Sequence, residues 1–182
     1  MTQPIPGFPA PSAGTEAPLE MLSACHARIE RQCATLRRLV PHLEAHGADE
    51  EARAAAANVI RYFDSSAQHH HDDEEKDLFP ALLESMAGSD AVCLRELTDA
   101  LKAEHRALDA DWRRVRASLA QIEAGTSAHL ASDDVEALVG RYERHIAREE
   151  QELLPMAARL LGDEDVARIG RSMRERRGIA GD

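Results

Sequence analysis

The sequence predicts an all-α protein, an antiparallel up-down-up-down bundle of four long helices. Three observations predict this fold. The chain has 182 residues, which is the size of one domain. Apolar side chains recur at spacings of three and four along four long stretches, and no stretch alternates as a strand would. Short segments containing glycine or proline connect the stretches, which favours antiparallel neighbours.

The chain begins with a segment that shows no periodicity. Residues 1–16 contain four prolines and two glycines and predict a disordered tail. The first helix is expected over about 17–46, where Pro41 should kink or loosen the last turn and Gly47 should end it. The inward stripe of this helix consists of Leu22, His26, Ile29, Cys33, Leu36, Val40 and Leu43.

The second helix is expected over about 49–87. Pro80 predicts a bend and not an end, because the apolar period continues beyond it. Gly88 should end this helix, and Ser89 or Asp90 should cap the next one. The inward stripe consists of Val59, Phe63, Ala67, His70, Glu74, Leu78 and Ala81.

The remaining helices are expected over about 90–124, 133–161 and 163–177, with Ser132 as the cap of the middle one. The inward positions of the first two are Leu94, Leu97, Leu101, His105, Leu108, Trp112, Val115, Leu119 and Ile122, then Val135, Leu138, Tyr142, His145, Glu149, Leu153, Met156 and Leu160. The last helix is short, amphipathic and rich in arginine. We therefore divide the chain into a flexible tail (1–16), a bundle (17–161) and a C-terminal segment (162–182).

Composition excludes several classes of protein. The net charge of −11 argues against nucleic-acid and anionic-membrane partners. Three cysteines without CxxC spacing predict no disulfide framework and no zinc–thiolate site, which favours a reducing, cytoplasmic location. The first residues do not resemble a secretion signal, and no apolar run is long enough for a transmembrane helix. The oligomeric state is not readable from the sequence.

Titratable groups interrupt all four apolar stripes. They are His26, His70 with Glu74, His105, and His145 with Glu149. Each histidine–glutamate pair has i, i+4 spacing, so both side chains share one helix face. Burial of two carboxylates without a cation is costly, and no lysine or arginine lies in this layer. A metal site is therefore predicted.

A ligand count indicates two metal ions. Four imidazoles, two bridging carboxylates and an oxide or hydroxide bridge would supply about ten of the roughly twelve positions of two octahedral ions. About two positions would remain open for a small ligand. Imidazole and carboxylate without thiolate suit iron or manganese, and zinc is not excluded by ligand type.

The segments around these histidines and glutamates resemble those of a known family. The segments His26-Ala-Arg-Ile-Glu30, His70-His71-Asp72-Asp73-Glu74-Glu75, Glu104-His105 and His145-Ile-Ala-Arg-Glu149-Glu150 are similar to those of hemerythrin-like (HHE cation-binding) domains. Leu-Phe-Pro follows the second segment after two residues, and Leu-Leu-Pro follows the fourth. The resemblance covers about 17–161.

The resemblance implies a non-haem di-iron centre in a four-helix bundle. His26, His70, His105 and His145 would be terminal ligands, and Glu74 and Glu149 would bridge. Oxygen carriers of the family have a further histidine one turn after the third-helix histidine. Asp109 stands there in this chain, which resembles the four-histidine bacterial branch.

The resemblance leaves several functions open. The leading expectation is binding or sensing of a small diatomic ligand, oxygen or nitric oxide. Alternatives are iron donation to damaged iron–sulfur clusters and a di-iron enzyme that consumes peroxide or nitric oxide. No flavin, haem or redox-partner motif is recognisable in this chain, so binding is favoured over turnover.

Neighbouring residues leave the ligand set partly open. His71 pairs with Glu75 just as His70 pairs with Glu74, and we prefer His70 because Glu74 lies on the apolar stripe. Glu75 is expected to be solvated, and Glu150 to lie toward solvent or the edge of the stripe, so changes at either should cost little. Glu30 and Asp109 are expected to accept hydrogen bonds from ligand histidines or to be solvated.

Overall fold

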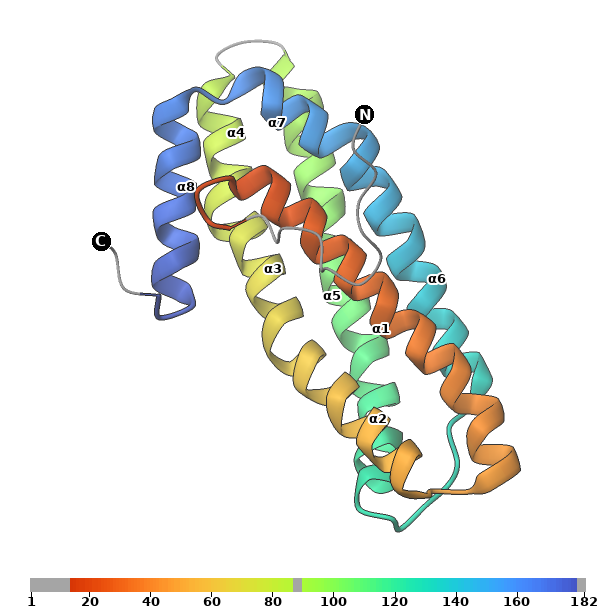
Figure 1. Cartoon of the computed structure of the whole chain (residues 1–182). Coiled ribbons are helices and arrows are strands. Elements are labelled where there is room, and N and C mark those ends of the chain that lie inside the picture. Colours follow the sequence, from red (N-terminus) through yellow and green to blue (C-terminus); the bar gives the residue numbers. More distant parts are fainter. Residues whose placement is uncertain (1–13, 87–89, 180–182) are drawn as a thin grey trace, which may run out of the picture.

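The computed structural model describes residues 14–86 and 90–179, and the regular structure within these ranges is helical. Four rods form the predicted antiparallel bundle, and a fifth helix lies along its side (Figure 1). The rods are α1 (Pro18–His46); α2 (Glu50–Tyr62), α3 (Gln68–Asp73) and α4 (Phe79–Ser85) in line; α5 (Asp90–Glu123); and α6 (Ser132–Arg148) with α7 (Leu154–Leu160). The fifth helix is α8 (Asp163–Arg176). None of the helices in the described ranges has an apolar stretch long enough to cross a bilayer.

The second and fourth rods contain wide π-helical turns, which sequence analysis did not foresee. Two of these turns begin at the glutamates of the predicted site, over Glu74–Leu78 and Glu149–Leu153. A proline follows each of them, Pro80 and Pro155. A proline ring clashes with the carbonyl four residues earlier and lacks an N–H donor. A widened turn accommodates both defects, so the rod continues through Pro80 as predicted.

Helix ends follow the prediction with one exception. Gly47 ends α1 with a φ of 70°, and α1 remains helical through Pro41 to His46. Ser132 is the first residue of α6 and not its cap, because the capping position falls on Ala131, whose side chain cannot accept a hydrogen bond. The expected helix end at Gly88 and the cap at Ser89 lie outside the described residues.

The core consists of two apolar clusters separated by a polar layer. The lower cluster, at the α2 end of the bundle, contains Leu36, Val59 and Trp112 (Figure 1). The upper cluster, at the α4 end, contains Leu22 and Leu101. Many stripe neighbours of these residues belong to the same clusters. The layer between them holds most of the buried histidines and glutamates of the described chain. The hydrophobic effect therefore stabilises the bundle on both sides of the polar layer.

Helix α8 is attached to the bundle by apolar contacts of Ile169 and Met173 and by buried charge. Asp73 at the end of α3 is fully buried, and both Arg176 and Arg177 contact its carboxylate. The first described residues also contact α8: Thr15 is buried, and its carbonyl oxygen lies 2.2 Å from where a Cβ on Gly170 would be. A side chain at position 170 would therefore displace the segment that leads into α1.

Candidate metal centre

Six sequence-predicted residues meet in the polar layer. His26 comes from α1, His70 from α3, His105 from α5 and His145 from α6. The carboxylates of Glu74 and Glu149 come from the first residues of the two π turns. All six residues are at most 4% exposed.

The donor atoms form two groups that share both glutamates. One group is His26, His70, Glu74 and Glu149, and the other is His105, His145 and the same two glutamates. Within each group the donor atoms lie within 4.8 Å of one another. This spacing allows one ion in each group.

Each carboxylate directs one oxygen to each group. Glu149 Oε2 lies 3.0 Å from His26 Nε2, and Glu149 Oε1 lies 3.1 Å from His145 Nε2. Glu74 Oε1 lies 3.5 Å from His70 Nε2, and Glu74 Oε2 lies 3.3 Å from His105 Nε2. Two carboxylates arranged in this way can bridge a pair of cations.

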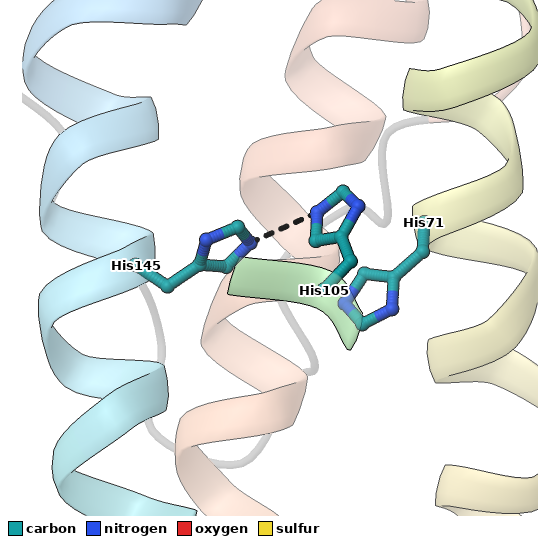
Figure 2. Close-up of side chains that lie close together, drawn as sticks. All are labelled: His71, His105 and His145. Carbon is teal, nitrogen blue, oxygen red and sulfur yellow. Dashed lines mark hydrogen bonds between the residues drawn. The ribbon is translucent and has the colours of Figure 1, made fainter. Parts of the chain in front are cut away.

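A fifth histidine, His71, joins the second group. Its ring stacks on His105 with centroids 4.1 Å apart, and its donor atom lies within 4.8 Å of those of His105 and His145 (Figure 2). His70 and His71 are alternatives by sequence spacing, whereas in the structure they lie in different groups. Consecutive helical residues differ by about 100° in direction, which lets two neighbours face two adjacent ions.

Several buried polar atoms in this layer form no hydrogen bond of acceptable geometry, although some of them lie 3.0–3.5 Å from one another. Among the described residues these are His26 Nε2, both ring nitrogens of His70, His71 Nε2 and both oxygens of Glu74 and Glu149. Unpartnered buried polar atoms are rare in folded proteins and costly. Cations bound between these atoms would satisfy most of them, so the residues present fit a pair of metal ions.

The other ring nitrogen of three histidines contacts an outer carboxylate. His26 Nδ1 lies 2.6 Å from Glu150, His105 Nδ1 lies 2.7 Å from Glu75, and His145 Nδ1 lies 2.8 Å from Glu104. The expectation that Glu75 and Glu150 simply face solvent is therefore wrong. Such hydrogen bonds fix the tautomer and orientation of a metal-binding imidazole.

The two acidic residues that sequence analysis left open take no part in this layer. Asp109 forms an ion pair with Arg113 on the surface of α5. Glu30 is exposed and lines a cavity between α1 and α6. The third histidine of the second group is thus His71 from α3 and not a residue of α5.

Burial and charge set the protonation of the metal-free layer. Burial raises the pKa of Glu74 to about 7, assisted by the charge of Glu149. Burial opposes protonation of His26, but contact with Glu149 outweighs it and raises the pKa of His26 to about 9. Burial also opposes protonation of His105, yet Glu149 and Glu74 raise its pKa to about 10. Histidinium ions therefore neutralise the carboxylates when no metal is bound.

These pKa shifts predict how the stability of metal-free protein depends on pH. The raised histidine pKa values add stability that is complete below about pH 6.5 and is lost as pH rises toward 9 and 10. The raised pKa of Glu74 acts in the same direction between about 4.5 and 7. We expect the melting temperature of metal-free protein to fall by about 5 °C or more between about pH 6.5 and 9.5. Metal-loaded protein, with neutral bound imidazoles, should not follow this trend; an equal fall in both forms would contradict the assignment.

Comparisons with known proteins identify the family of the chain. An uncharacterized protein of Haemophilus influenzae (strain ATCC 51907 / DSM 11121 / KW20 / Rd) is 30% identical over 162 residues, which cover 89% of this chain and 91% of the relative. The sequence also matches the hemerythrin HHE cation binding domain over residues 17–157, which include all five histidines and both central glutamates. The chain therefore belongs to the hemerythrin HHE cation-binding family.

Proposed function

We propose that this protein holds two non-haem iron ions in the polar layer and binds or senses a small diatomic ligand, oxygen or nitric oxide, there. The observation that carries the proposal is that Glu74 and Glu149 each direct one oxygen to both histidine groups. His26 and His70 would hold one ion, and His71, His105 and His145 the other. Manganese or zinc could occupy the same donors, which are nitrogen and oxygen only.

The two ions would differ in how many positions remain open. An octahedral ion has about six positions. The first group offers two imidazoles and two carboxylate oxygens. The second offers the same number, and His71, which lies near His105 and His145, would add a third imidazole. If an oxide or hydroxide bridge adds one donor to each ion, only the ion of His26 and His70 keeps a vacant position. An iron ion held by His26 and His70 would supply reversible ligand binding coupled to its redox state.

Retention of iron fits this arrangement better than donation of iron. Outer carboxylates hold three of the five histidines, and loss of such a partner typically lowers metal affinity about 10–100-fold. Arg148 in turn contacts Glu104 at 2.5 Å. These supporting contacts favour a resident centre over a labile store.

Metal analysis and ligand titration of the purified protein test the proposal. We expect about two irons per chain after anaerobic loading with iron(II), and near-ultraviolet charge-transfer bands after exposure to air. Nitric oxide should bind to the reduced protein and change its spectrum. His71→Ala should lower affinity at one ion and leave the other in place, whereas His129→Ala, outside the layer, should change neither. Binding of fewer than about one iron per chain to the wild-type protein would overturn the proposal.

A further inference from the structure

A cavity of about 240 Å³ lies between α1 and α6, one turn from the polar layer. Its apolar walls include Cys33, Ala34 and Ile146, and Tyr142 also lines it, three residues before His145 on α6. The Tyr142 ring is buried, and its centroid lies 6.4 Å from that of His71. No hydrogen bond to the Tyr142 side chain is present among the described residues.

The direction of the chain brings both central carboxylates to the layer from the same end of the bundle. Glu74 follows His70 by four residues and Glu149 follows His145 by four, and the second and fourth rods run in the same direction (Figure 1). Helices α4 and α7, which continue these rods, are in contact at that end. Tyr142 precedes His145 by three residues and therefore lies toward the opposite end. Tyr142 therefore faces the side of the layer that lies opposite the π turns of Glu74 and Glu149.

Charge at the rim of the cavity indicates what can pass. Arg37 forms an ion pair with Glu143 across the opening and is also paired with Glu136, while Glu30 lies on the same rim. Carboxylates thus outnumber the one arginine, on a protein of net charge −11. Such a rim disfavours anions, and the apolar wall behind it favours small neutral molecules.

We propose that this cavity is the access route and holding site for a neutral diatomic gas, and that the Tyr142 ring gates passage from it to the side of the layer opposite the π turns. The inference rests on the proposed function and adds the route to the same site. Tyr142 acts here as a positioning residue, because its ring borders the cavity and lies near His71 but is not itself a metal ligand.

Xenon and paired substitutions test the route. Xenon is a neutral probe for apolar cavities and needs no bound iron, so crystals of the metal-free protein under xenon pressure report on the cavity alone. Ala34→Phe should fill the cavity from its rim. Ala55→Phe is the matched control, because Ala55 lies in a separate cavity of about 250 Å³ that also borders α1. The second measurement is the association rate of nitric oxide with iron-loaded protein by stopped flow.

We expect xenon beside Tyr142 in the wild-type protein and none there in Ala34→Phe. Ala34→Phe should slow nitric oxide association about tenfold with unchanged iron content, and Ala55→Phe should not. Tyr142→Ala should speed association, and Tyr142→Phe, which keeps the ring, should retain the wild-type rate. Glu30→Gln should speed association of azide, an anion, and leave the nitric oxide rate unchanged.

The results also separate this inference from the proposed function. An unchanged nitric oxide rate in Ala34→Phe with two irons bound would overturn the route and leave the function intact. If the iron-loaded wild-type protein does not bind nitric oxide, the proposed function fails. Absence of xenon from the cavity in metal-free crystals would overturn the holding site in either case.

Discussion

Glu149→Gln is expected to remove both metal ions from the protein. The carboxylate of Glu149 lies about equally far from His26 in one group and His145 in the other, so its loss affects both. Glutamine has nearly the same shape but no charge, and its amide nitrogen cannot bind a cation. The loss of affinity should therefore exceed the about 10–100-fold effect typical of removing an outer partner. Metal content after dialysis against a moderate chelator measures the effect.

Glu150→Gln is the matched control, because it changes the next residue in the same way. The Glu150 carboxylate contacts His26, through Nδ1. We expect an intermediate loss that is larger at the ion of His26 and His70. Asp109→Asn, on the surface of α5, should change nothing. Retention of two tightly held ions by Glu149→Gln would show that this residue does not bridge.

The second large effect is expected where α8 meets the bundle. Replacing both Arg176 and Arg177 by alanine leaves the fully buried carboxylate of Asp73 without its cationic partners. Breaking a buried ion pair in this way costs about 3–5 kcal/mol. The melting temperature of the metal-free protein should fall by about 10 °C, as measured by circular dichroism. Asp77, which contacts Arg176 at 2.7 Å, also loses its partner.

Two further variants separate this effect from general surface damage. Arg168→Ala removes an exposed ion pair with Glu84 and Asp165 and should change stability by less than about 1 kcal/mol. Asp73→Asn added to the double alanine variant removes the unpaired charge and should restore part of the stability. If the double alanine variant melts like the wild type, the contacts with Asp73 do not hold α8.

The sequence was sufficient to predict the bundle and the central layer. Apolar positions at helical spacing identified the buried faces, and polar residues on those faces had to meet because four amphipathic helices can bury their stripes only together. His26, His105 and His145 could therefore be placed in one layer without coordinates. The i, i+4 spacing also placed Glu149 beside His145.

Residues just off the buried faces could not be placed in this way. His71, Glu75 and Glu150 lie about 100° from the stripe, where the packing of the neighbouring helix decides whether a side chain is covered. The π turns that begin at Glu74 and Glu149 add to this, because a wider turn shifts the following residues around the rod. Contacts between α8 and Asp73 join residues about a hundred positions apart, and no local pattern indicates them.

The contact between α8 and the segment that leads into α1 brings the first and last helices of the fold together. Thr15 lies against Gly170, and Arg174 donates a hydrogen bond to the Thr15 hydroxyl at 3.2 Å across 159 positions of sequence. Chains whose ends meet are suited to circular permutation. A linker could join the end of α8 to the segment that leads into α1, and the exposed loop at 124–129 offers new termini far from α8. In such a chain α8 would precede α1 directly, and the contact between Thr15 and Gly170 would join residues that are close in sequence.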